Sequence, residues 1–425
     1  MHKKQSLLFR RAAIAIFGMS AGVSFFMIVT VLFFRLSSAM VAPKEIGLFA
    51  FVSLPYNVRF LWPFLIDHFR IPYFAARLGQ RRSWGVLAQL ASCILVILLG
   101  STDPAANLPR TFCLATLLSF FSALHDIVSE IYRFHFAEKI SHDSSVPLQT
   151  VGFRCGQFLA ASLVPIISAF FGWLAGHMVV AIVKIAAAFF ITKLEEPKEK
   201  AERYRKKRGF FQEIKGKVLT IFAKTAQNPL LGVFLLSIIL MRIIDTVPGP
   251  LQTIFIGKIG ISNFDFGLVK GGCGIIFVML GIPTASYFVK KTGVLNALFC
   301  GVLCQSFASM LSLLLLDLHD DSHVLLLMSL STSFQDFFQG FMNTSIIIYI
   351  SSFCETKLSI YYFTLFSTIS SMSRSIATYA LSTISTTVGW DFVFCLPIML
   401  CFPLAIVFAF LGRKNCLHNV FSHRS

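Results

Sequence analysis

Long apolar stretches separated by short polar segments run along the whole chain, and this pattern predicts membrane-spanning helices. A helix needs ~20 mostly apolar residues to cross a bilayer. Twelve stretches of about this length are present, so the sequence predicts an all-α membrane protein with twelve transmembrane helices. They are residues 12–34, 46–66, 84–100, 109–130, 149–171, 173–192, 229–256, 266–289, 293–316, 323–350, 358–386 and 390–411.

The first apolar stretch follows a basic N-terminus, MHKKQSLLFRR, as the core of a secretory signal peptide does. Residues 12–34 are longer than the ~7–15 residues of such a core, so we expect a retained first helix. The polar segments on the side of the N-terminus contain 27 Lys and Arg residues, against 4 on the opposite side. Because basic residues accumulate in cytoplasmic loops, both termini are expected in the cytoplasm.

The longest polar segment, residues 193–228, follows six predicted helices and precedes six more. It divides the chain into an N-terminal half (1–192), a basic cytoplasmic linker (193–228), and a C-terminal half with a short basic tail (229–425). We expect the linker to be a solvated strip or one that faces lipid headgroups, with regulatory binding as the alternative. Two six-helix halves predict a binding site near the middle of the membrane, between the halves.

Composition supports a polytopic membrane protein, because 56% of the residues are hydrophobic and only 13% are charged. The net charge of +17 is explained by the basic loops, so we expect no nucleic-acid partner. The ten cysteines contain no C-x-x-C pair, and neither disulfides nor a metal site is expected. No phosphate-binding or serine-hydrolase motif occurs, so we expect neither an enzyme nor a cofactor.

Several predicted spans contain ionisable or amide residues, which are costly in a bilayer and therefore suggest a functional site. Substrate-cavity candidates are Arg154, Arg242, Lys270, Gln335, Asp336 and Arg374. Basic residues in a cavity suit an anionic or carboxylate-bearing ligand. The alternative is that the charges only neutralise one another, for example Arg154 with Asp126 or Glu130, and Arg374 with Asp336.

Acidic residues in the spans are candidates for proton coupling, since a carboxyl group shielded from water can carry a proton between the two sides. Asp126 and Glu130 are four residues apart on one helix face and are the first choice, because two nearby acids help to hold one proton. Asp245 is the second choice. His125 is interpreted as a packing residue, with a proton relay as the alternative.

The segment between the second and third predicted helices carries an acid followed by arginines: Asp67, Arg77, Arg81 and Arg82. Its motif, Phe60-Leu61-Trp62, Leu65 and Asp67, then Arg81-Arg82, Trp84 and Gln89, resembles the AmpG-type muropeptide permeases of the major facilitator superfamily. SALHDIVSEIYRF, VGFRCGQ and the positions of Arg242, Asp245, Lys270 and Arg374 extend the resemblance over most of the chain. It implies that Asp67, Arg77, Arg81 and Arg82 form a gating motif that holds neighbouring helix ends together.

The resemblance implies a proton-coupled transporter that imports anhydro-muropeptides across the bacterial cytoplasmic membrane by alternating access, without a cofactor and as a monomer. The departures are Glu130 where the family has Asp, and the order Phe334-Gln335-Asp336 in the tenth predicted helix. These positions leave the substrate open. The alternatives are another anionic solute, such as an acyl-CoA or a nucleotide-like ligand, an integral membrane enzyme acting on lipid-linked sugars, and a non-transporting receptor or scaffold.

Overall fold

The computed structural model describes residues 7–72, 74–140, 142–196, 229–317, 323–352 and 359–413, and within these ranges every regular element is a helix. The first part of the chain forms α1 (Leu7–Phe26), α2 (Leu32–Ser38), α3 (Pro43–Leu48), α4 (Leu54–Asn57), α5 (Trp62–His68), α6 (Phe74–Leu78), α7 (Gln80–Ser101), α8 (Leu108–Ile140), α9 (His142–Phe158) and α10 (Val164–Lys193). The second part forms α13 (Pro229–Thr246), α14 (Gln252–Lys258), α15 (Asn263–Phe266), α16 (Gly274–Thr292), α17 (Val294–Met310), α18 (Leu314–Asp317), α19 (Val324–Ser352), α20 (Ser359–Thr387) and α21 (Trp390–Arg413). The all-α prediction is therefore confirmed, while most of the predicted linker, 197–228, lies outside the described residues.

Eight helical stretches of the described residues are long and apolar enough to cross a membrane. They are Leu7–Ser38, Gln80–Ser101, Leu108–Arg133, Pro147–Lys193, Gly232–Lys258, Asn263–Thr292, Val294–Leu316 and Trp390–Leu411. The predicted spans 323–350 and 358–386 coincide with α19 and α20. Pro147–Lys193 contains both predicted spans 149–171 and 173–192, which meet at Gly172, where a φ of 79° interrupts α10.

The predicted span 46–66 is wrong as a single helix. This region runs through α3, α4 and α5, with 3-10 segments η2 (Phe49–Ser53) and η3 (Arg59–Leu61) between them. Pro55 and Pro63 explain the breaks, since each lacks a backbone N–H and clashes with the carbonyl four residues earlier. Because of these breaks, Tyr56 and Asn57 end the short helix α4, and Arg59 begins the 3-10 segment η3.

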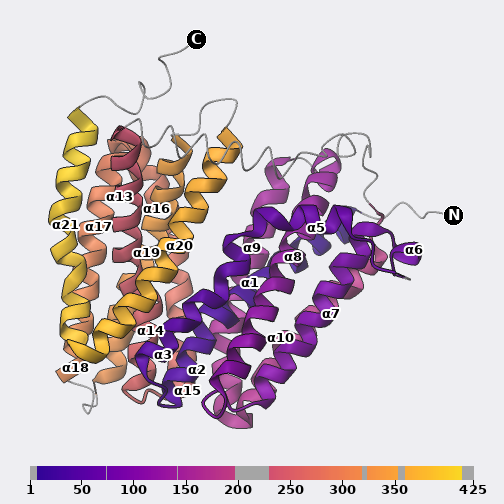
Figure 1. Ribbon diagram of the computed structural model, residues 1–425, viewed down its shortest axis with the longest axis horizontal. Coiled ribbons are helices and arrows are strands. Elements are labelled where there is room, and N and C mark those ends of the chain that lie inside the picture. Colours follow the sequence, from indigo (N-terminus) through magenta and orange to yellow (C-terminus); the bar gives the residue numbers. More distant parts are fainter. Residues whose placement is uncertain are drawn as a thin grey trace.

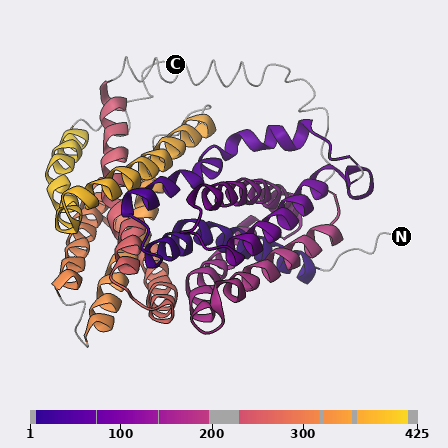
Figure 2. The ribbon, with the colours of Figure 1, turned by 60° about the horizontal axis from the view of Figure 1, so that its bottom comes forward.

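The two parts of the chain form two groups of helices, which Figures 1 and 2 show side by side. They meet at the end away from the two termini, where α2 packs on α14 and α3 packs on α20. Phe34 stacks on Phe266 with ring centroids 3.8 Å apart, and the Ser37 hydroxyl donates to the Ile254 carbonyl. The contacts between the groups are therefore tightest at this end of the molecule.

Two pairs of glycines bring α1 and α9 into backbone contact. Gly18 and Gly22 on α1 face Gly152 and Gly156 on α9, and a Cβ at any of them would lie 2.1–2.2 Å from a carbonyl oxygen of the other helix. Each pair is a G-x-x-x-G spacing, which lets membrane helices approach closely. This seam fixes α9, the helix that carries Arg154.

We expect Gly152→Ala to lower the melting temperature of the purified protein in detergent by several degrees. The added methyl group would lie 2.1 Å from the Ala15 carbonyl oxygen, so the two helices must separate. Gly232→Ala is the matched control, because nothing lies within 4 Å of a Cβ there and alanine favours the helix by ~0.5–1 kcal/mol. Equal melting temperatures for the two variants would contradict the close seam.

Candidate functional site

A cavity of about 690 Å³ lies between the two groups of helices. This volume is within the ~300–1,000 Å³ range of small-molecule sites. Its charged lining residues are Arg59, Arg154, Arg242, Lys270, Asp336 and Arg374. Five of the six predicted cavity residues therefore line a single cavity, and they come from both parts of the chain.

Gln335 is the exception, and its prediction as a cavity residue is wrong. Its amide nitrogen donates to the Ala308 carbonyl at 3.0 Å, the Ser312 hydroxyl at 2.7 Å and the Ser331 hydroxyl at 2.9 Å. Successive helical residues point ~100° apart, so Asp336 can face the cavity while Gln335 faces α17. The Gln335 side chain therefore holds α19 against α17.

Asp245 is fully buried between two arginines. One of its carboxylate oxygens lies 3.1 Å from Nη1 of Arg242 and 3.7 Å from Nε of Arg374, and the other accepts from the Gln305 amide at 3.3 Å. The expected pair of Arg374 with Asp336 is wrong, since Asp245 is its partner. Asp245 thus compensates two cations and does not line the cavity itself, and its role as a proton carrier stays a prediction.

Arg242 extends this network to two further helices. Its Nε donates to the Ser370 hydroxyl on α20 at 2.6 Å, and its Nη1 donates to Oδ1 of Asn343 on α19 at 2.7 Å. Lys270 and Asp336 form a second ion pair of 2.7 Å, in which the lysine also donates to Gln252 at 3.4 Å. The three cations on this side of the cavity thus each have a carboxylate partner.

Arg154 differs from these cations. Its Nη1 donates to Oε1 of Gln157 at 2.7 Å, and its guanidinium carbon lies 5.9 Å from the centre of the Phe153 ring. Its Nε has no hydrogen-bond partner among the described residues. The expected pairing with Asp126 or Glu130 is wrong, because no ion pair joins them in the part of the chain that the structure describes.

Asp126 and Glu130 occupy different surroundings although they share a face of α8. Glu130 pairs with Arg133, accepts from the Gln149 amide at 3.2 Å, and its side chain is 44% exposed. Asp126 has a shielded carboxylate oxygen without a hydrogen-bond partner among the described residues. Neither residue lines the cavity, and the network around Glu130 makes Asp126 the better candidate of the two.

Lys184, a fully buried residue of α10, was not among the predicted site residues. Its ammonium group donates to the Ser20 carbonyl and hydroxyl, both at 2.9 Å, and to the Ser24 hydroxyl. Gln89 bonds both to Ser20 and to His125, so one polar cluster joins α1, α7, α8 and α10. The lone lysine in an apolar helix was the sequence feature that could have identified it.

His125 of α8 belongs to this cluster, and Asp126, the next residue, lies on a different face of the helix. His125 bonds through one ring nitrogen to Gln89 at 2.7 Å and lies 3.3 Å from the Phe17 carbonyl through the other, in agreement with a packing role. Lys184 and Arg59 both lie within electrostatic range of Asp126. Asp126 thus interacts electrostatically with two cations, although no ion pair joins it to either among the described residues.

Two arginines of the predicted gating motif, Arg81 and Arg82, lie at the start of α7, while Arg77 lies in α6. Nε of Arg82 lies 3.5 Å from the Glu196 carboxylate, which also accepts from the backbone N–H groups of Arg81 at 2.7 Å and Arg82 at 3.2 Å. Glu196 therefore caps α7 at its positive end, a role that sequence reasoning missed. Arg77 is exposed, and the side chain of Asp67 lies outside the described residues, so its predicted gating role stays a prediction.

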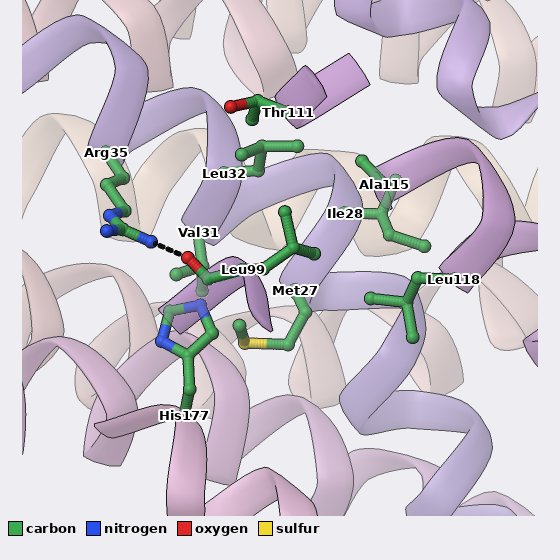
Figure 3. A pocket seen from close by; sticks show the side chains of 10 residues that line it. All are labelled: Met27, Ile28, Val31, Leu32, Arg35, Leu99, Thr111, Ala115, Leu118 and His177. Carbon is green, nitrogen blue, oxygen red and sulfur yellow. Dashed lines mark hydrogen bonds between the residues drawn. The ribbon is translucent and has the colours of Figure 1, made fainter. Parts of the chain in front are cut away.

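Arg35 performs a comparable role at the other end of α7. It donates to the carbonyls of Leu99 at 2.6 Å and Thr102 at 2.5 Å, and its guanidinium lies 5.1 Å from the centre of the Trp173 ring. Figure 3 shows this side chain reaching the Leu99 carbonyl beside His177. A cation at a helix C-terminus stabilises the free carbonyls there, so α7 is fixed at both ends.

The described residues contain no group of three or more His, Cys, Asp or Glu side chains that could hold a metal ion.

Comparison with known proteins gives relatives that match most of the chain. The Rickettsia prowazekii protein named transporter AmpG 3 is 24% identical over 88% of this chain and 88% of its own. The Rickettsia conorii protein named AmpG 4 is 23% identical over 96% and 97%. The resemblance to the AmpG-type permeases is confirmed by these matches. A family model described as acetyl-coenzyme A transporter 1 matches residues 12–108.

Solved transporters share the fold. A mutant of the nucleoside transporter NupG has a TM-score of 0.70 at 12% identity, covering 95% of this chain and 99% of that one. The inward open conformation of the xylose transporter XylE from E. coli has a TM-score of 0.66 at 14% identity, covering 94% and 95%. The chain is therefore similar to membrane transporters in both sequence and fold, and the fold is of the major facilitator type.

Proposed function

We propose that this chain, which resembles the AmpG-type permeases, imports anhydro-muropeptides across the bacterial cytoplasmic membrane together with protons. The observation that carries this proposal is the cavity of about 690 Å³ lined by basic residues from both parts of the chain. Arginine holds carboxylates through paired N–H groups, and a muropeptide offers peptide carboxylates. Hydroxyl and amide side chains, among them Gln339, Ser371 and Thr378, also line the cavity and suit sugar hydroxyls.

The proposed cycle is alternating access between two six-helix halves, 1–192 and 229–425, with both termini in the cytoplasm. The contacts between the groups of helices are tightest at the end away from the termini. With cytoplasmic termini, this arrangement keeps the cavity closed toward the periplasm. Opening it outward would separate Phe34 from Phe266 and close the opposite end, where Arg82 and Glu196 lie.

An acyl-CoA is the second candidate substrate, because the family model that matches residues 12–108 is described as acetyl-coenzyme A transporter 1. The basic cavity suits its phosphates as well as it suits carboxylates. The match covers the first part of the chain only, while the relatives named AmpG match most of it. We therefore place the muropeptide first.

Uptake into proteoliposomes tests the proposal. We expect labelled anhydro-muropeptide to accumulate when an inward proton gradient is applied and to be released unaltered by detergent, because a transporter does not convert its cargo. An excess of unlabelled muropeptide should abolish uptake, and the same excess of acetyl-CoA should not. Uptake of labelled acetyl-CoA by folded protein that takes up no muropeptide would transfer the proposal to the acyl-CoA, and altered cargo would indicate an enzyme.

A further inference from the structure

The two walls of the cavity differ in how their charges are compensated. On the wall from the second part of the chain, Arg242 and Arg374 share Asp245, and Lys270 pairs with Asp336. On the wall from the first part, neither Arg154 nor the exposed Arg59 has a carboxylate partner among the described residues. The three cations of the second part share two carboxylates, whereas the two arginines of the first part have none, so an anionic ligand group is attracted most strongly toward the first wall. On that wall Arg154 attracts it more strongly than Arg59, because water screens the exposed Arg59 more effectively.

The hydrogen bonds of Arg154 leave one particular edge of its guanidinium group for a ligand. Nη1 is occupied by Gln157, at 2.7 Å. Nε has no partner among the described residues, and the neighbouring Nη2 lies on the same edge of the group. Two parallel N–H groups on one edge match the two oxygens of a carboxylate. Gln157 acts as a positioning residue, because its bond fixes the rotation of the guanidinium plane.

The same wall contains a further donor that lacks a partner. Nδ2 of Asn57 has no hydrogen-bond partner among the described residues, and its side chain lines the cavity next to Tyr56. Unpaired buried donors are costly, so a ligand that brings acceptor oxygens gains affinity by satisfying them. Asn57 and Tyr56 end the short helix α4, whose breaks place them beside the cavity.

Arg154 is also held rigidly. It lies between Gly152 and Gly156, the two glycines of α9 that contact the backbone of α1. Phe153 packs against Phe25 and Phe26, with ring centroids 6.2 and 6.1 Å away. A preorganised arginine loses little conformational freedom on binding, which favours affinity.

On this basis we infer that the substrate binds in one orientation, with a carboxylate on the Nε–Nη2 edge of Arg154 and its uncharged hydroxyl-bearing part against α19 and α20. This inference rests on the proposed function and adds which wall recognises the acid. Arg242, Lys270 and Arg374 then hold helices together and contribute little to acid recognition.

Paired ligands test the orientation in purified full-length protein. The probes are anhydro-N-acetylmuramyl-L-alanine, which has a single carboxylate, and the corresponding L-alanine amide, with dissociation constants measured by calorimetry. We expect the wild-type protein to bind the acid about 10–100-fold more tightly than the amide, as for hydrogen bonds to charged groups. Arg154→Gln should reduce this ratio to about one while changing amide affinity by less than about threefold. Arg154→Lys should restore part of it, since lysine keeps the charge without the paired N–H groups.

The matched control removes a cation together with its carboxylate partner from the opposite wall. Lys270→Gln combined with Asp336→Asn deletes a neutral pair and should leave the acid-to-amide ratio within about threefold of wild type. A ratio that survives in Arg154→Gln and collapses in this control would overturn the inference and place the acid on the other wall. Failure of the folded wild-type protein to bind either probe would instead overturn the proposed function, and the inference with it.

Discussion

Asp245→Asn is expected to destabilise the protein more than any other single substitution among the cavity charges. The wild-type carboxylate is fully buried and compensates both Arg242, 3.1 Å away, and Arg374, 3.7 Å away. Breaking a buried pair by removing one partner costs about 3–5 kcal/mol, because the other charge stays in a poorly solvated place. We expect a large fall in the melting temperature of detergent-purified protein and in the fraction that elutes as a single species.

Asp391→Asn is the control for this substitution, because Asp391 is exposed in the first turn of α21. Its loss should change the melting temperature little. The combination of Arg242→Met with Asp245→Asn should recover part of the lost stability, since it removes the stranded buried cation as well. Arg374 tolerates the loss of its partner better, because its side chain is 30% exposed to the cavity. The explanation would be contradicted if the double variant lost as much unfolding free energy as the two single variants lose together.

The apolar pattern of the sequence located most of the long helices and the charges within them, because a buried charge stands out in an apolar stretch. Arg154, Arg242, Lys270, Asp336 and Arg374 were predicted on this ground, and all of them line the cavity. The pattern could not assign partners. Partners depend on which helices are neighbours, and helical periodicity describes the faces of one helix only.

Other errors have equally local causes. The prediction of a continuous helix over 46–66 gave the prolines too little weight relative to the apolar run. The prediction of Gln335 as a cavity residue ignored that it and Asp336 face different directions. Glu196 was counted as part of a polar linker, yet it caps a helix that begins 116 residues earlier, at Gln80. Such a contact exists only after the chain has folded.

The sequence contains two motifs of close helix packing, but it does not show which helices these motifs bring together. Gly18 and Gly22, and again Gly152 and Gly156, show the spacing of a packing motif. Only the structure shows that these two motifs face each other. This pairing also explains why Arg154 projects from a rigid position into the cavity.

Asp126→Asn is the second substitution for which we expect a large effect, in this case on coupling. Asparagine keeps the shape of the side chain but cannot exchange a proton. One oxygen of Asp126 has no hydrogen-bond partner among the described residues, and Arg59 and Lys184 lie within electrostatic range. When this carboxyl group binds or releases a proton, its electrostatic interaction with the two cations changes. The free-energy difference between the conformational states then depends on whether the group is protonated.

We expect Asp126→Asn to reduce gradient-driven accumulation of anhydro-muropeptide in proteoliposomes by at least about 10-fold, as the loss of a ~1.4 kcal/mol coupling term predicts. Exchange of labelled for unlabelled substrate, which needs no net proton movement, should continue at a rate close to that of wild type. Glu130→Gln is the control, because Glu130 is half-exposed and paired with Arg133 on the same face of α8, and it should keep both activities. Equal loss of accumulation and exchange in Asp126→Asn would assign the residue to substrate binding or folding. Unchanged accumulation would show that the proton is carried elsewhere, and the buried cluster around Lys184 would then be the next place to substitute.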